Sequence, residues 1–253
     1  RFAAALLLLA AFAWIETRAR APLIPLRLLR LRNLATANVA GVLWAAAMFA
    51  WFFISALYLQ RVLGYSAFQV GLSFLPANLI MAAFSLGLSA RLVLRLGRRV
   101  PLAGGLLLAA FGLALFARAP LDGSFIVDVL PGMVLLGLGA GIALNPLLLA
   151  AMSDVEPAES GLASGIVNTA FMIGGALGLA LLASLAAVRS DALHAAGADP
   201  RAALVGGYRL AFACGAGFAA AAALIGGLFL RAAPRKAKAA AILRPVETRT
   251  GQH

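Results

Sequence analysis

Charge is scarce in this sequence, and its scarcity limits the class of protein. Charged residues make up 12% of the 253 residues, against about 25% in soluble domains, whereas apolar residues make up 63%. Because so few polar side chains cannot cover a water-exposed surface, this composition excludes a soluble enzyme and a disordered chain. The single cysteine, Cys214, excludes an intrachain disulfide and therefore a disulfide-rich secreted scaffold.

Acidic residues and histidines are scarcer still, and none lies in the middle of an apolar segment. The nine acidic residues and two histidines fall in or near the breaks between these segments. Proton-coupled transport normally uses an ionisable group within the membrane, so we expect the proton-coupling group to lie outside this chain. The sequence also shows no nucleophile constellation, metal-ligand spacing or phosphate loop. We therefore expect no cofactor, no metal and no enzyme activity.

Six long apolar segments are present, and their lengths favour transmembrane helices over the strands of a barrel. A helix pairs its own backbone groups, as hydrocarbon requires. The breaks between the segments are rich in Gly, Pro, Asp and Ser, which are typical of turns. We predict an all-α integral membrane protein with helices at 35–60, 68–90, 100–117, 125–151, 161–188 and 207–231.

The remaining residues divide into an N-terminal apolar run, a linker and a tail. Residues 1–15 are typical of the end of a truncated helix; a secretory signal is the alternative, but the arginines that follow argue against it. Residues 16–34 form an Arg-rich linker, in which a short interfacial helix at 26–30 is possible. Residues 35–232 form the six-helix bundle, and residues 233–253 form a basic tail.

Basic residues are distributed unequally between the two sets of loops. If the linker is cytoplasmic and the helices alternate, the cytoplasmic segments hold 15 Lys and Arg residues and the outer segments hold five. This bias predicts a cytoplasmic linker and tail, because cytoplasmic loops are enriched in Lys and Arg. It also explains the net charge of +12 by topology, so we expect no nucleic-acid binding.

Several motifs resemble those of drug:proton antiporters of the major facilitator superfamily, in the fourteen-helix branch (the EmrB/QacA type). The matching segments follow the order and spacing of that family from about residue 14 to residue 232: Trp14-Ile15-Glu16, Pro22-Leu23-Ile24-Pro25-Leu26, Leu57-Tyr58-Leu59-Gln60-Arg61-Val62-Leu63-Gly64-Tyr65-Ser66, Gln69-Val70-Gly71, Phe74-Leu75-Pro76, Gly161-Leu162-Ala163-Ser164-Gly165, Asn168-Thr169 and Gly174-Gly175-Ala176-Leu177-Gly178.

The resemblance implies that this chain is the C-terminal half of a transporter, with three plus three helices. Its partners would be the lipid bilayer, the missing N-terminal half, small amphipathic substrates and protons. The family's inner-loop motif has a degenerate copy at residues 90–99, where Leu94 replaces the family's Asp. Orientation in the membrane is the first explanation of its cationic and turn residues, and a gating contact with the other half is the second: Arg91, Arg95, Gly97, Arg98 and Arg99.

Two further groups of residues are candidates for functional contacts. Polar, aromatic or flexible side chains inside the helices are substrate-cavity candidates, with packing between helices as the alternative: Trp44, Trp51, Ser55, Asn78, Asn145, Asn168 and Met172. Trp44, Trp51, Ser55 and Tyr58 share one helical face. Glycines spaced by four residues predict close helix packing: Gly137 with Gly141, Gly161 with Gly165, and Gly174 with Gly178.

Together these observations predict a multi-pass protein of the cell membrane that exports amphipathic or cationic compounds by alternating access. An exporter of a metabolite or a lipid is the nearest alternative. A membrane scaffold without transport activity and a membrane enzyme are the alternatives from other classes. An enzyme would need convergent acidic or histidine groups, and the loop at residues 154–159 offers only the acidic ones.

Overall fold

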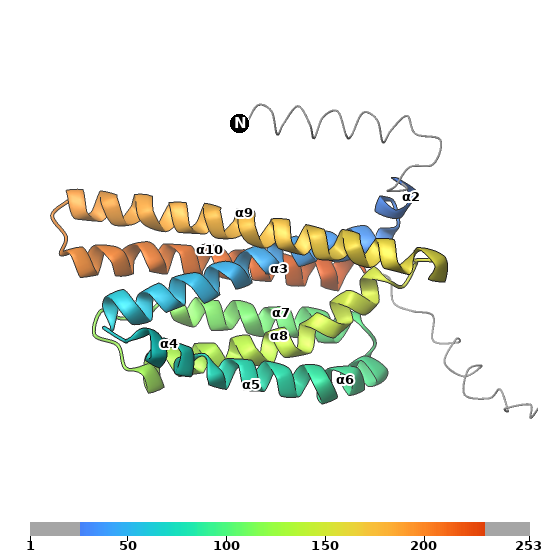
Figure 1. Cartoon of the computed structure of the whole chain (residues 1–253), viewed down its shortest axis with the longest axis horizontal. Helices are drawn as coiled ribbons and strands as arrows, with labels where there is room; N and C mark the ends of the chain where they lie inside the picture. The colour runs from blue at the N-terminus through green and yellow to red at the C-terminus, as the bar shows by residue number, and fades with distance from the viewer. Residues whose placement is uncertain (1–25, 231–253) are drawn as a thin grey trace, which may run out of the picture.

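The protein is a bundle of long antiparallel helices (Figure 1). The structure, a computed structural model, describes residues 26–230, and the predictions for residues 1–15, for most of the linker and for the tail lie outside them. Six helices in the described part are long and apolar enough to cross a membrane, which confirms the predicted fold class: Arg32–Val62, Ala67–Leu96, Arg99–Phe116, Phe125–Ala151, Pro157–Ala195 and Pro200–Phe229.

These spans comprise twelve of the thirteen helical elements of the described chain, and the other element is α2 (Leu26–Leu29). The first three spans are α3 (Arg32–Leu57) with η1 (Tyr58–Val62); α4 (Ala67–Ser73), α5 (Leu75–Ala83), η2 (Phe84–Leu88) and α6 (Ser89–Leu96); and α7 (Arg99–Phe116). The last three are η3 (Phe125–Val129) with α8 (Leu130–Ala151); η4 (Pro157–Glu159) with α9 (Ser160–Ala195); and α10 (Pro200–Phe229).

The two sets of three spans pack against each other in a symmetric pattern. In the first set, α3 packs against α9 and α10 of the second set. In the second set, α8 packs against α5 and α7 of the first. The first helix of each set therefore contacts the second and third helices of the other, which is the relation expected of internal repeats in a transporter. The hydrophobic pattern alone did not show this repeat, because the two sets have no clear sequence similarity to each other.

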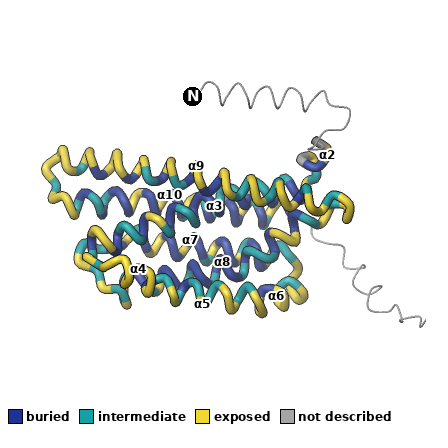
Figure 2. The backbone as a smooth tube through the Cα atoms, in the orientation of Figure 1, coloured by how far each residue is buried: buried dark blue, intermediate teal, exposed yellow. Residues whose placement is uncertain are grey.

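Burial differs strongly among the spans (Figure 2). In the most apolar stretch of each span, 56% of the residues of Arg32–Val62 are buried, against 28% in Pro157–Ala195 and 6% in Ala67–Leu96. The span that begins with α3 is therefore central. The α9 helix and the α4–α6 span form two edges, on opposite sides of the bundle in Figure 1.

Several helix boundaries differ from the prediction, and the largest differences are in α9 and α10. Helix α9 continues to Ala195 rather than ending at residue 188, and α10 begins at Pro200 rather than at residue 207. The polar residues 189–191 end an apolar segment but not a helix, since a helix that emerges into water needs no apolar side chains. Asp199 starts α10 by accepting hydrogen bonds from the backbone N–H groups of Arg201 and Ala202, at 3.0 and 3.2 Å.

The bundle has two ends, the hairpin end and the α2 end. The hairpin end carries the α9–α10 turn at residues 196–199, which extends beyond the ends of α3 and α7 (Figure 1). The α2 end carries α2 and the loops at 97–98 and 152–156. The α3 helix begins at Arg32, so residues 32–34 belong to the first span rather than to the linker.

Candidate functional site

The edge formed by α9 carries an exposed polar stripe near the α2 end. Ser164, Asn168 and Thr169 are exposed, and Met172 follows one turn later with 47% of its surface exposed. No other described residue hydrogen bonds to the side chain of Asn168 or Thr169. Gly161 and Gly165 lie beside them, and a Cβ atom on either glycine would meet nothing within 4 Å. This part of α9 therefore offers small and polar groups to a partner or to water.

The aromatic candidates on α3 are buried instead. Trp44 and Trp51 are 1% and 4% exposed, and Ser55 donates a hydrogen bond to the carbonyl oxygen of Trp51, four residues earlier. The ring of Trp51 lies 5.7 Å from the ring of Phe74 and 6.4 Å from that of Phe116. Their burial corresponds to the packing role that was the alternative to a cavity wall.

The amide candidates differ in their contacts. Asn145 on α8 donates to the carbonyl oxygen of Ser85 in η2, at 2.6 Å. Asn78 on α5 is half-buried, and its side chain hydrogen bonds to no described residue. Asn145 therefore has the inter-helix contact expected of a packing residue, whereas Asn78 has a free amide near the exposed face of α5.

A proline in α8 explains a second contact beside Asn145. Pro146 has no N–H group, so the carbonyl oxygen of Ile142 lacks its usual partner in the helix. The buried hydroxyl of Ser89 on α6 donates to that oxygen at 3.1 Å. Serine side chains satisfy freed carbonyls in this way within membranes. Sequence reasoning missed this contact because Ser89 and Ile142 are 53 residues apart.

Glycines allow close approach of helices in the interior. A Cβ atom on Gly137 would lie 2.5 Å from the carbonyl oxygen of Ala77, and one on Gly141 would lie 2.7 Å from that of Met81. Gly174 and Gly178 approach α3 equally closely, at Val42 and Ala46. These four positions therefore lie at close contacts between helices. Gly161 and Gly165 contact nothing in the described chain at that position.

The gating candidates at residues 91–99 separate into three kinds. Gly97 ends α6 with a φ of +79°, a conformation that side chains disfavour. Arg98 donates to the carbonyl oxygen of Leu149 at 2.9 Å, and Arg99 donates to those of Gly227 and Leu228. These two arginines cap the C-terminal ends of α8 and α10, where the helix dipole favours a cation. Arg91 and Arg95 are exposed.

A second polar cluster at the α2 end ties the linker to the loop before α9. Arg27 on α2 pairs with Glu156 at 3.2 Å and with Glu159 at 2.7 Å, and these contacts raise the pKa of Arg27 above its usual value. Asn33 donates to Asp154, from its backbone at 3.3 Å and from its side chain at 3.1 Å. The acidic loop that the enzyme alternative needed is therefore paired within the protein.

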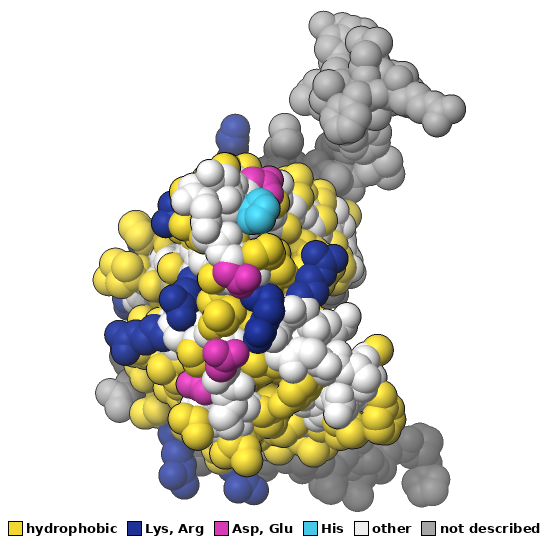
Figure 3. Space-filling model, turned by 90° about the vertical axis from the view of Figure 1, so that its left-hand side faces the viewer, with side chains coloured by type: hydrophobic (Ala, Val, Ile, Leu, Met, Phe, Trp, Pro, Cys, Tyr) yellow, Lys and Arg dark blue, Asp and Glu magenta, His cyan; other side chains and the backbone are white. Residues whose placement is uncertain are grey.

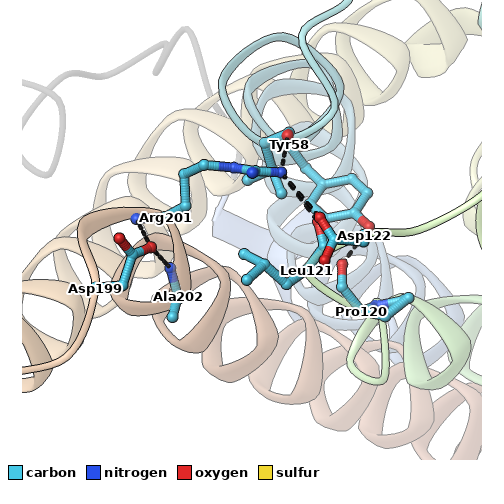
Figure 4. A network of polar contacts seen from close by, with 8 residues as sticks. Tyr58, Pro120, Leu121, Asp122, Asp199, Arg201 and Ala202 are labelled. Carbon is cyan, nitrogen blue, oxygen red and sulfur yellow. Dashed lines mark hydrogen bonds and ion pairs between the residues drawn. The ribbon is translucent and has the colours of Figure 1, made fainter.

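Figure 3 views the hairpin end, where basic, acidic and histidine side chains lie among hydrophobic ones. Arg201 at the start of α10 donates to the carbonyl oxygen of Val62 at 2.9 Å and pairs with Asp122 at 3.4 Å (Figure 4). The hydroxyl of Tyr58 donates to the carbonyl oxygen of Pro120 at 2.7 Å. These contacts join η1, the start of α10 and the loop at 117–124 at the hairpin end.

Acidic and histidine side chains are scattered in the described chain. No group of three or more His, Cys, Asp or Glu residues could hold a metal ion within residues 26–230. The acidic and histidine residues of that part lie near the ends of the spans or in the loops.

Comparison with known proteins identifies relatives. Residues 2–179 match the sequence profile of the Major Facilitator Superfamily. The cephamycin export protein CmcT of Amycolatopsis lactamdurans is 37% identical over 182 residues, covering 71% of this chain and 37% of that protein. The puromycin resistance protein pur8 of Streptomyces alboniger is 34% identical over 217 residues, covering 83% of this chain and 43% of that protein.

A third relative is the lincomycin resistance protein of Streptomyces lincolnensis, which is 39% identical over 180 residues. That match covers 70% of this chain and 36% of the relative. The chain therefore spans about two-fifths of the length of the curated relatives that it matches.

Proposed function

Because this chain belongs to the major facilitator superfamily, we propose that it forms the C-terminal half of a proton-coupled exporter of antibiotics and other amphipathic compounds. The relatives named above are export and resistance proteins, which supports this class of cargo. In the proposal, the six spans move as one body against the other half, and substrate binds between the two. The linker and the basic tail lie on the cytoplasmic side.

The observation that carries the proposal is the exposed polar stripe on α9. Ser164, Asn168 and Thr169 lie in a span, where a polar side chain facing lipid is costly. Gly161 and Gly165 in the same stripe leave room for another helix to approach. A stripe of this kind is best covered by another protein half or by a water-filled cavity, so we assign Asn168 and Met172 of α9 to the substrate side.

Proton coupling is assigned to the other half for a physical reason. A proton carrier within the membrane must be an ionisable group there. The described spans hold acidic residues and histidine only near their ends. Because α3 packs extensively against α9 and α10, this half moves as one body in the proposal and carries no proton.

The proposal can be tested by transport in liposomes that carry a pH gradient. We expect ethidium to move against its gradient in liposomes holding the complete transporter, to stop when an uncoupler is added, and not to move with this chain alone. Coupled ethidium transport by the chain alone would contradict the assignment of the proton carrier. If neither ethidium nor puromycin responded in the complete transporter, the cargo assignment would be wrong, and a metabolite or lipid would replace it.

A matched pair of variants tests the stripe itself. Asn168→Ala removes an amide from the stripe, and we expect it to lower ethidium transport about tenfold, the effect of one hydrogen bond of about 1.4 kcal/mol. Leu177→Ala changes an exposed residue on the opposite side of α9 and should leave transport unchanged. Equal transport by both variants would remove Asn168 from the substrate side.

A further inference from the structure

An apolar groove of about 400 Å³ lies on the outside of the bundle, where α6 meets α7. Leu92 and Leu96 of α6 form one wall, and Gly104, Leu108 and Phe111 belong to the α7 wall. All of its lining residues are aliphatic, aromatic, proline or glycine. The groove can therefore hold hydrocarbon but cannot orient a polar ligand along its length.

The length of the groove matches one leaflet of a bilayer. Val100 and Phe111 both line it, and the eleven residue steps between them on α7 correspond to about 16 Å. Half of a hydrocarbon core of ~30 Å is ~15 Å. An acyl chain that lies along α7 would thus reach from the membrane surface at the α2 end to the middle of the bilayer.

Two arginines that have no hydrogen-bond or ion-pair partner among residues 26–230 lie on α6, beside this groove. Arg91 and Arg95 are one turn apart on α6, next in sequence to Leu92 and Leu96 of the groove wall. Both are exposed, and neither hydrogen bonds to an acceptor within residues 26–230. Their neighbours Arg98 and Arg99 instead bind carbonyl oxygens of α8 and α10. The first pair is therefore free to bind an anion at the membrane surface.

We propose that this groove binds an anionic phospholipid, with one acyl chain along α7 and the phosphate between Arg91 and Arg95. Charge complementarity selects the headgroup, because basic sites between spans favour anionic lipids and guanidinium groups bind phosphate through two hydrogen bonds. The apolar walls accept the chain. The site is separate from the substrate side on α9, so it does not depend on the proposed cargo.

Gly104 gives the groove a position where it can be filled without disturbing the fold. A Cβ atom on Gly104 would meet nothing within 4 Å, whereas one on the adjacent Gly105 would lie 2.7 Å from the carbonyl oxygen of Gly139. Leucine at position 104 would thus occupy the space of the acyl chain, and leucine favours a helix more than glycine does. Gly217 on α10 is also exposed with open space around it and provides a matched control outside the groove.

The proposal is tested by native mass spectrometry of the purified chain in detergent, with dioleoyl phosphatidylglycerol, dioleoyl phosphatidylcholine or inorganic phosphate added. We expect retained phosphatidylglycerol, at least tenfold weaker phosphatidylcholine, and no phosphate adduct. Equal retention of the two lipids would overturn the role of the arginines. A phosphate adduct as strong as the phosphatidylglycerol adduct would overturn the role of the groove.

Variants then separate headgroup from chain. Arg91→Gln combined with Arg95→Gln should weaken phosphatidylglycerol binding about 30-fold, because each basic residue contributes about a factor of five at an anionic surface. Arg118→Gln, at an exposed arginine of the hairpin end, should have no effect. Gly104→Leu should also weaken binding, and Gly217→Leu should not. Unchanged binding in the double arginine variant, or in a folded Gly104→Leu variant, would overturn the proposal.

Discussion

The two halves of α9 carry the same glycine spacing in opposite surroundings. Near the middle of the helix, a Cβ atom on Gly174 would lie 2.7 Å from the Cα atom of Val42, and Gly178 faces Ala46 as closely. Near the α2 end, a Cβ atom on Gly161 or Gly165 would meet no atom of residues 26–230 within 4 Å. One pair of glycines is thus used within this chain, while the other is free for a partner outside it.

This difference shows what a spacing of four between glycines determines. The spacing places two small residues on one helical face and so allows a close approach. It does not determine which helix approaches. On α9 the closed pair marks the contact with α3, and the open pair lies beside the polar stripe of Asn168. The same helix therefore has a structural half and a half suited to contacts with a partner.

The largest expected effect comes from adding one methyl group to each pair. Gly178→Ala should lower the free energy of unfolding by about 1–3 kcal/mol, because the new Cβ atom forces α9 away from Ala46. Gly165→Ala should leave it unchanged or raise it by up to about 1 kcal/mol, since alanine favours a helix and meets nothing there.

Thermal unfolding of the two variants in the same detergent measures this difference. The helix, the substitution and the added volume are identical, so the two variants serve as controls for each other. Equal losses of stability would mean that Gly161 and Gly165 also lie at a contact within the chain.

A smaller effect is expected where a hydrogen bond, rather than a pair of glycines, joins two helices. Ser89→Ala leaves the carbonyl oxygen of Ile142 unpaired beneath Pro146 and should cost about 1 kcal/mol. Ser55→Ala is a matched control, because Ser55 is equally buried but donates to a carbonyl of its own helix. Thermal unfolding should show a clearly smaller loss for Ser55→Ala, and equal losses would show that the Ile142 oxygen finds another partner.

The smallest effect is expected at the open end of α9, where Arg27 pairs with Glu156 and Glu159. Arg27→Gln should change stability only slightly, and the change should shrink in high salt, because these ion pairs are largely exposed. The carboxylates raise the pKa of Arg27, so its contribution is complete below the ordinary arginine pKa and is lost only as pH rises above it. Unfolding of the wild type and the variant at two salt concentrations near neutral pH tests this. A stability difference that stayed the same in high salt would contradict the ion-pair explanation.

The sequence predicted the six spans because hydrocarbon imposes a strong requirement on every residue of a span. It did not predict the ends of α9 and α10, because Arg189, Ser190 and Asp191 interrupt the apolar segment and a helix that leaves the membrane needs no continuous apolar run. Asp199 followed by Pro200 is a helix-start signal that could have located α10.

The candidate site was less predictable, because a pattern along one helix does not say what covers a face. Trp44 and Trp51 share a face, as predicted, but rings and helices from elsewhere in the chain bury that face. Arg98 and Arg99 cap helices whose ends lie 51 and 128 residues away. Asn168 differs from them because no described helix covers it.

The extension of α9 and α10 at the hairpin end has a mechanical consequence. The α9 helix has 36 residues and is therefore about 54 Å long. If this half tilts about the centre of α9, a rotation of about 10° displaces the tip of the helix by about 5 Å. A spin label or fluorophore at the exposed His194 would thus report small rotations of the half as measurable changes in distance.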